Sequence, residues 1–159
     1  MGTEIERKFM VHPDAWHPDP ARGIPYRQGY LSTDPARVVR VRTMGDSAAL
    51  TIKGRTQGIA RLEFEYAIPL ADAAILLEQC CARPLVEKRR YRERHGGRIW
   101  AIDVFAGVNA GLVLAEVELP SSSTPIVLPP WVGPEVSDDP RYFNSNLARF
   151  PFNQWSPER

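Results

Sequence analysis

The chain has 159 residues, of which 43% are hydrophobic and 25% are charged, and its 20 Lys and Arg against 19 Asp and Glu give a formal net charge of +1. This composition is that of an ordinary globular protein, and it excludes wholesale disorder, a collagen-like chain and a coiled coil. The balanced charge argues against a nucleic-acid partner, because domains that bind duplexes normally carry a clear basic excess. The length predicts one domain over residues 1–159.

Local sequence features argue against a secreted or membrane-spanning protein. The N-terminal segment is charged from Glu4 onward and has no apolar stretch of the kind that a signal peptide needs. No segment approaches the roughly 18 uncharged apolar residues of a membrane span. Cys80 and Cys81 are adjacent, which is a poor arrangement for a disulfide and is typical of a reducing compartment. We therefore predict a cytoplasmic protein without a membrane partner.

Alternation of polar and apolar residues with a period of two dominates the chain and predicts eight strands. A turn at Gly45-Asp46 joins the third and fourth of these strands, which should form a hairpin. The predicted strands are residues 3–11, 24–32, 37–44, 48–55, 60–69, 84–94, 98–105 and 111–119.

Two helices and one long loop complete the predicted elements. Residues 71–81 are rich in good helix formers and predict a mid-chain helix. An aspartate before Pro140 predicts the start of a C-terminal helix over 140–149, whereas the Ser- and Pro-rich segment 121–134 predicts a loop. Because the helices do not alternate with the strands, these elements predict a mainly β (α+β) fold, an eight-stranded antiparallel β-barrel, and exclude a parallel α/β sheet.

Charged residues of one sign recur two positions apart within the predicted strands, and such pairs lie on one strand face. An ordinary barrel with its charged faces in water accounts for any single strand, but like charges this close repel one another. We therefore expect an inverted barrel, whose apolar faces pack outward and whose charged faces line a tunnel. The pairs are Glu4 and Glu6, Arg40 and Arg42, Glu63 and Glu65, Lys88 and Arg90, and Glu116 and Glu118.

A tunnel lined by both carboxylates and basic side chains suits chemistry on a chain of phosphates. Carboxylate oxygens are ligands for Mg²⁺ or Mn²⁺. Arginine and lysine side chains hold phosphoryl oxygens. The residues alone thus predict metal-dependent chemistry on a polyanionic phosphate compound.

The segment Glu4-Ile5-Glu6-Arg7-Lys8 resembles the ExExK signature of the CYTH superfamily, the triphosphate tunnel metalloenzymes, and the tail DDPRYFNSNLA resembles its short bacterial inorganic triphosphatases. The resemblance implies an eight-stranded antiparallel β-tunnel that hydrolyses inorganic triphosphate (tripolyphosphate) to pyrophosphate and phosphate with Mg²⁺, or with Mn²⁺. Further matches follow in the order of the family: Arg40-x-Arg42, LTIKG, RLEFEY, Lys88-Arg89-Arg90-Tyr91, IDVF and Glu116-Val117-Glu118-Leu119.

The resemblance also implies three overlapping sets of site residues. The catalytic set comprises Glu4, Glu6, Lys8, Tyr30, Glu63 and Glu65. The substrate-binding set comprises Lys8, Arg40, Arg42, Lys53, Arg61, Lys88 and Arg90. The metal-binding set comprises Glu4, Glu6, Glu63, Glu65, Asp103, Glu116 and Glu118. Within it, Glu116 and Glu118 are expected to hold the ion that bridges the phosphates, and the other glutamates to serve a second metal or the attacking water.

Several alternatives stay open at this level. Tyr30 is expected to contact Lys8 beside the terminal phosphate, or else to be a strand aromatic that packs against its neighbours. The substrate could instead be an organic triphosphate, such as thiamine triphosphate or a nucleoside triphosphate, and the activity could be that of a class IV adenylate cyclase. A non-catalytic module that binds polyphosphate or nucleotide is the hypothesis from a different class. A homodimer through the outer apolar faces is a further hypothesis.

Overall fold

The computed structural model describes residues 2–155, and within them it contains nine strands and two α-helices. The helices are α1 (Leu70–Gln79) and α2 (Asn144–Arg149). The strands are β1 (Gly2–Val11), β2 (Ile24–Ser32), β3 (Val38–Met44), β4 (Ser47–Lys53), β5 (Ala60–Ala67), β6 (Val86–His95), β7 (Arg98–Phe105), β8 (Val113–Glu118) and β9 (Val132–Glu135).

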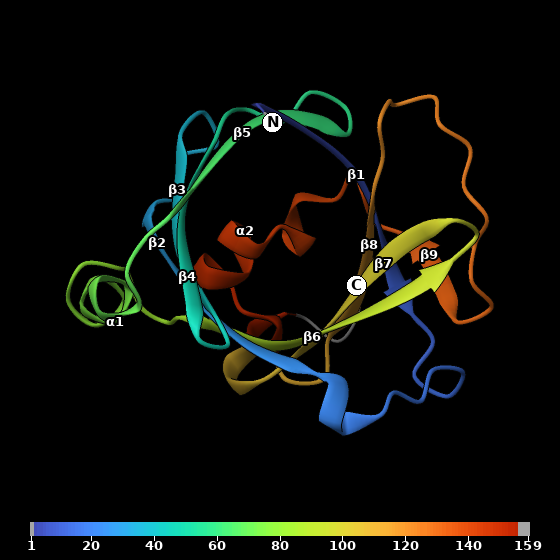
Figure 1. The fold of residues 1–159 in the computed structure, drawn as a ribbon, viewed down its shortest axis with the longest axis horizontal. Helices are drawn as coiled ribbons and strands as arrows, with labels where there is room; N and C mark the ends of the chain where they lie inside the picture. The colour runs from blue at the N-terminus through green and yellow to red at the C-terminus, as the bar shows by residue number, and fades with distance from the viewer. Residues whose placement is uncertain (1, 156–159) are drawn as a thin grey trace.

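Eight of the strands close into an antiparallel barrel in the order β5-β4-β3-β2-β6-β7-β8-β1, and a further pairing of β5 with β1 completes the ring (Figure 1). Strand β1 closes the barrel with both of its edges, because Gly2–Ile5 pair with β5 and Glu6–Met10 pair with β8. The mainly β fold and the eight-stranded barrel predicted from the alternation are confirmed.

The predicted hairpin turns form where glycine permits them. Met44 pairs with Ser47 across a turn in which Gly45 has a φ of 62°. His95 pairs with Arg98 across Gly96 and Gly97, whose φ values are also positive. Side chains other than glycine seldom adopt this left-handed conformation, which explains the glycines at these two turns.

The outer faces of most strands are apolar and are covered by other parts of the chain, whereas the apolar outer face of β5 is exposed. Helix α1 lies outside the barrel (Figure 1) and buries Ala73 and Leu77 against Val41 and Ala48. With ten residues α1 is the longest helix in residues 2–155, and none in this range has the length and hydropathy to cross a bilayer. A second outer cluster packs Phe9, Trp16, Trp100, Trp131 and other apolar side chains around β1, β7 and β8.

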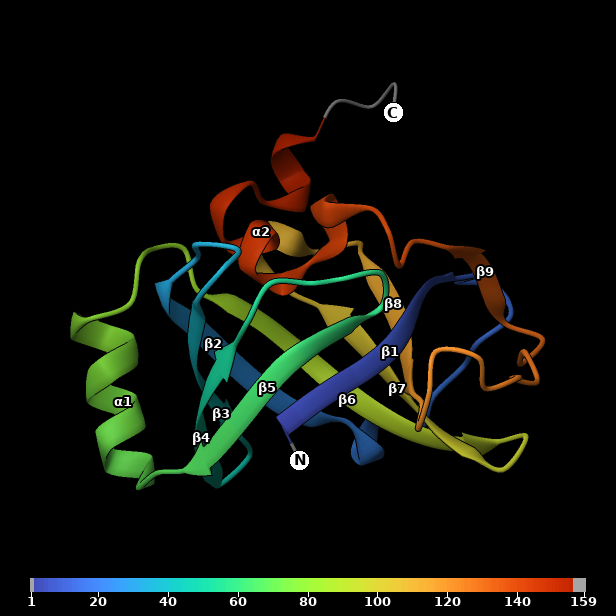
Figure 2. The same cartoon turned by 90° about the horizontal axis from the view of Figure 1, so that it is seen from above.

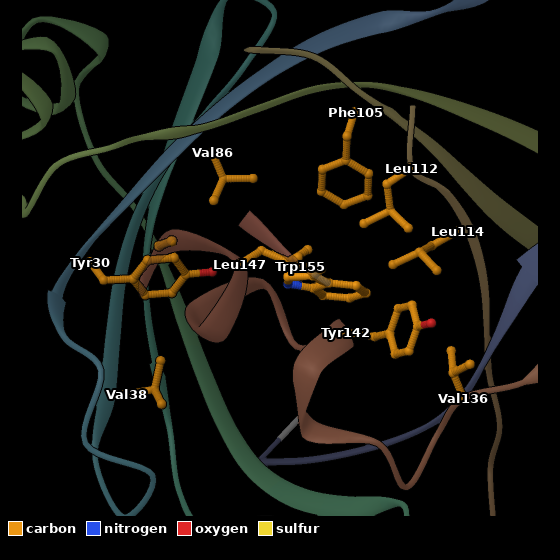
Figure 3. Close-up of a cluster of buried hydrophobic side chains, with 11 residues drawn as sticks. Tyr30, Val38, Val86, Phe105, Leu112, Leu114, Val136, Tyr142, Leu147 and Trp155 are labelled. Carbon is orange, nitrogen blue, oxygen red and sulfur yellow. The ribbon is translucent and has the colours of Figure 1, made fainter. Parts of the chain in front are cut away.

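The C-terminal segment closes one end of the barrel. Figure 1 shows α2 within the ring of strands, and Figure 2 shows that it covers one end. Its Leu147 is fully buried together with Tyr142 and Trp155 against apolar residues of the barrel interior, among them Val86 and Phe105 (Figure 3). The inside of the barrel is therefore apolar at this end, where residues 140–155 form a plug beside the cavity.

Two elements differ from those predicted after residue 120. Residues 132–135 form β9, which pairs with Phe9 and Val11 near the C-terminal end of β1. The sequence predicted a loop over residues 121–134 instead. The predicted helix over 140–149 is divided into a 3-10 turn, Pro140–Tyr142, and α2, because Phe143 between them has extended backbone with a ψ of 135°. The extended residue lets the chain turn inward into the barrel.

Candidate active site

A cavity of about 630 Å³ occupies the barrel interior and is bounded on one side by the start of α2. Fourteen of the fifteen residues predicted for the site line it, although they come from seven different strands, β1 to β6 and β8. They line it because every one has an inward position in the alternation of its strand. These residues are Glu4, Glu6, Lys8, Tyr30, Arg40, Arg42, Lys53, Arg61, Glu63, Glu65, Lys88, Arg90, Glu116 and Glu118, with Asp103 set behind them.

Most charged residues of the lining come from two sets of strands that lie on opposite sides of the barrel (Figure 1). The adjacent strands β8, β1 and β5 carry Glu4, Glu6, Glu116 and the other lining glutamates, and form an acidic wall. The adjacent strands β3, β2 and β6 carry no lining carboxylate and form a basic wall, whose cations come from β3 and β6. Lys8 on β1 and Arg61 on β5 are the cations within the acidic wall.

At each boundary between the two walls, one charged residue pairs with side chains of the neighbouring wall. A lysine pairs with glutamates of the acidic wall, and an aspartate pairs with cations of the basic wall. On β4, Lys53 Nζ lies 3.1 Å from Glu4 Oε1 and 3.0 Å from Glu63 Oε2. On β7, Asp103 lies 2.7 Å from Arg90 Nε and 2.9 Å from Lys88 Nζ. These ion pairs fix the long side chains at the edges of both walls.

Asp103 does not line the cavity, and this changes its predicted role. It is 2% exposed and accepts hydrogen bonds from Arg90 Nε and Nη2 at 2.7 and 2.8 Å. Burial alone would raise the pKa of Asp103, but the charges of Arg90 and Lys88 hold it below the usual range. The structure therefore places Asp103, predicted as a metal ligand, as a partner of two cations that were predicted to bind substrate. Arg90 also donates to Glu116 Oε1 at 2.9 Å.

The contact predicted between Lys8 and Tyr30 stays a prediction, and in the structure each side chain has another hydrogen-bond partner. Lys8 Nζ donates to the carbonyl oxygen of Tyr142 at 3.2 Å and lies 3.8 Å from Glu116 Oε2. The hydroxyl of Tyr30 accepts a hydrogen bond from Gln28 Nε2 at 2.9 Å, and its ring packs in the apolar cluster of the plug (Figure 3).

Two arginines of the basic wall have buried donors without an acceptor in residues 2–155. Arg40 and Arg42 are 7% and 8% exposed, and the Nε atom of each has no hydrogen-bond partner there. Buried donors are normally paired, so unpaired ones beside a cavity indicate an anion that would accept from them. Burial, together with the nearby charges of Arg40 and Arg90, also lowers the pKa of Arg42 to about 10.

Two glutamates of the acidic wall lack a compensating charge. Glu6 and Glu118 form no ion pair with any described residue, and they are direct partners across β1 and β8. Burial and the charges of Glu116 and Glu4 raise the pKa of Glu6 to about 8. Burial and the neighbouring glutamates also raise the pKa of Glu118. This part of the wall carries more negative charge than the protein itself neutralises.

The acidic wall fits a divalent cation by its chemistry, although its carboxylates are not gathered as a finished site. Within residues 2–155 no three His, Cys, Asp or Glu side chains are grouped closely enough to hold a metal ion. Glu4, Glu63 and Glu116 are instead engaged by lysine or arginine. An anion that drew these cations toward the basic wall would release hard oxygen ligands of the kind that Mg²⁺ prefers.

The cavity extends beyond the predicted residues. Arg92 and Arg98 line it near the β6–β7 hairpin, and Asn144 and Ser137 line it beside the plug. Arg92 continues the alternation of Lys88 and Arg90 on β6, so the same strand pattern could have predicted that Arg92 faces the cavity. Asn144 accepts a hydrogen bond from Lys88 Nζ at 2.9 Å across 56 positions of sequence, a contact with no local signature.

Comparison with known proteins identifies the family. The CYTH domain matches residues 2–146, and the chain belongs to the CYTH domain family. An inorganic triphosphatase of Acetivibrio thermocellus is 47% identical over 155 residues, which are 98% of this chain and 99% of the relative. An inorganic triphosphatase of Nitrosomonas europaea is 39% identical over 151 residues, which are 92% of this chain and 97% of that relative.

Solved structures share the fold. The crystal structure of an inorganic triphosphatase is similar at a TM-score of 0.64 and 37% identity, and the match covers 91% of this chain and 97% of the other. A Pyrococcus horikoshii protein is similar at a TM-score of 0.55 and 17% identity, covering 75% of this chain and 79% of the other. The second likeness concerns the fold alone.

Proposed function

We propose that this protein hydrolyses inorganic triphosphate (tripolyphosphate) to pyrophosphate and phosphate, with Mg²⁺ or Mn²⁺ as the required ion. The observation that carries the proposal is the cavity in which a basic wall faces an acidic wall. The names of the two relatives, both inorganic triphosphatases over nearly the whole chain, support the same substrate.

The basic wall would bind the phosphate chain. Arg40 and Arg42 supply guanidinium groups whose buried Nε donors have no hydrogen-bond acceptor within residues 2–155. Guanidinium groups bind phosphate oxygens through two donors at once, and lysine adds a point charge. The proposed substrate-binding residues are Lys8, Arg40, Arg42, Lys53, Arg61, Lys88 and Arg90.

The acidic wall would hold the metal. Glu6 and Glu118 are the best candidates because they have no ion pair within the described residues, and Glu4 and Glu116 flank them. When bound, the ion would supply positive charge that neutralises phosphate oxygens and makes water a better nucleophile. We assign Glu63 and Glu65 to a second ion or to the orientation of the attacking water.

The protein's own groups would contribute mainly positioning and charge. Hydrolysis breaks one P–O–P bond by in-line attack of water, which adds its oxygen to the phosphorus and gives its proton to solvent or to a carboxylate of the wall. Lys8, tethered to the plug through the Tyr142 carbonyl, would stabilise charge that develops on the phosphate at that end. Tyr30 would support this end of the cavity through Gln28.

An organic triphosphate is disfavoured by the lining. Among the described lining residues the aromatic side chains are Tyr30 and Phe143, and both belong to the plug region. A base or a thiazolium ring placed away from the plug would therefore find no aromatic side chain among the described lining residues to stack on. A non-catalytic binding module is disfavoured as well, because phosphate binding alone gains nothing from six lining glutamates.

The test is phosphate release from tripolyphosphate, ATP and thiamine triphosphate side by side, with Mg²⁺ and with excess chelator, and with cyclic AMP measured for ATP. Release from tripolyphosphate that chelator abolishes is the expected result. Preference for ATP or thiamine triphosphate would overturn the substrate, and tight binding of tripolyphosphate without release would indicate a binding module.

Two further predictions concern the surroundings of the protein. A cytoplasmic location stays a prediction. The homodimer also stays a prediction, to which the structure adds one observation: Leu62, Phe64 and Tyr66 on the outer face of β5 are 56%, 39% and 56% exposed. Light scattering coupled to size-exclusion chromatography measures the oligomeric state.

A further inference from the structure

Tyr26 lies on β2, at the centre of the basic wall, and is not itself part of the cavity lining. Its side chain is 3% exposed. Its ring centroid is 4.9 Å from Arg42 Cζ and 5.0 Å from Arg90 Cζ, and these arginines come from β3 and β6, the strands on either side of β2. The phenol oxygen accepts a hydrogen bond from Arg92 Nη2 at 3.2 Å. One side chain thus contacts three cations.

The arginines need such a partner because they are buried close to one another. The electron-rich face of an aromatic ring attracts a cation, and this attraction offsets part of the repulsion between two buried like charges. Arg90 has further anchors in Asp103 and Glu116. Arg42 has a 3.8 Å ion pair with Glu65, so the ring of Tyr26 is a principal constraint on its orientation.

We infer that Tyr26 is a positioning residue, whose ring holds Arg42 and Arg90 apart and directs both toward the phosphates of the substrate. The inference rests on the proposed function of the cavity. The inference attributes the positioning of Arg42 and Arg90 to the ring of Tyr26 and not to its hydroxyl, which contacts Arg92 at the margin of the site. Because the arginines would hold the phosphates before as well as during the reaction, loss of the ring should weaken substrate binding more than it slows turnover.

The test compares Tyr26→Leu, which removes the ring, with Tyr26→Phe, which removes only the hydroxyl. We expect the leucine variant to raise KM for tripolyphosphate about 10-fold or more, with kcat within about 3-fold of the wild-type value. The phenylalanine variant should retain most of the wild-type affinity. Tyr91→Leu is the matched control, because Tyr91 is a buried aromatic of the outer cluster. It should lower the unfolding temperature but leave KM unchanged.

Circular dichroism and the unfolding temperature of each ligand-free variant establish that it folds, and Tyr26→Met replaces the leucine variant if that one does not. An unchanged KM in the ring-deleted variant, or an equal rise in KM in the phenylalanine variant, would overturn the inference. If the wild-type protein releases no phosphate, the proposed function fails. Calorimetric titration with tripolyphosphate in chelator then tests the inference by binding alone. The inference requires Tyr26→Leu to bind more weakly than both the wild type and Tyr26→Phe.

Discussion

Glu6 on β1 and Glu118 on β8 are directly opposite each other in the antiparallel pair, and neither has an ion pair within the described residues. Like charges in such positions destabilise a sheet. The arrangement is costly for the protein alone and would become less so if the two carboxylates held a divalent cation. It connects the register of two strands with the metal dependence proposed for the cavity.

The substitution Glu118→Gln should therefore have effects of opposite sign on stability and on activity. At a pH above the pKa of Glu6, which is about 8, both carboxylates are charged, and removing one of the two charges should increase the free energy of unfolding by about 0.5 kcal/mol in chelator. The same change should weaken Mn²⁺ binding and lower kcat for tripolyphosphate at least about 100-fold. Denaturant unfolding, calorimetry and phosphate release measure the three effects.

Glu78→Gln is the control for that experiment, because Glu78 lies on the exposed surface of α1 and pairs with Arg83. It should leave metal binding and activity unchanged. A Glu118→Gln variant that binds Mn²⁺ as tightly as the wild type would contradict the assignment of Glu118 to the metal.

The raised pKa of Glu6 predicts how stability depends on pH. Its pKa is about 8 in the folded protein, against 4.5 as the ordinary value. Between these values the folded state binds more protons than the unfolded state, so the contribution of Glu6 to stability is present at low pH and is lost as pH rises toward 8. Each unit of pKa difference corresponds to about 1.4 kcal/mol.

Denaturant unfolding in chelator at pH 5 and pH 8 measures this dependence. The wild type should lose more stability than Glu6→Gln between the two pH values, because the amide does not titrate. Saturating Mn²⁺ should reduce the difference by binding the ionised carboxylate. Equal pH dependence of the two proteins would contradict the position given to Glu6.

A substitution of Asp103 distinguishes a role as the structural partner of Arg90 and Lys88 from a role as a metal ligand. Asp103→Asn leaves Arg90 and Lys88 without their buried counter-charge, which should cost about 3 to 5 kcal/mol of stability. Binding of tripolyphosphate should weaken while Mn²⁺ affinity stays unchanged. The opposite pattern, intact stability with weaker Mn²⁺ binding, would restore the metal-binding role predicted from the sequence. Asp72→Asn on the exposed side of α1 is the control.

Strand alternation was sufficient to predict the barrel and which side chains face its interior, because both depend on local periodicity. The partners of those side chains depend on the whole fold. Asp103 faces inward as predicted, but its depth beside Lys88 follows from the pairing of β6 with β7. The plug could not be predicted from local pattern, since α2 has six residues and is held by distant partners such as Tyr30 and Val86.

Arg40 tests the basic wall. Arg40→Ala removes a buried guanidinium group whose Nε has no partner in residues 2–155, and it should raise KM for tripolyphosphate about 10-fold or more. Arg37→Ala removes an exposed arginine three positions earlier, which pairs with Asp34 on the surface, and should leave KM unchanged. Steady-state phosphate release measures both. Equal values of KM for the two variants would contradict the placement of substrate on this wall.

The most direct measurement of the central claim is ³¹P NMR of tripolyphosphate incubated with the protein and Mg²⁺. The account predicts that each tripolyphosphate consumed yields one pyrophosphate and one phosphate, that chelator stops the reaction, and that Glu116→Gln slows it. Tripolyphosphate that stays intact with Mg²⁺ present, or hydrolysis at the wild-type rate by the Glu116→Gln variant, would contradict the claim that this cavity is a metal-dependent triphosphatase site.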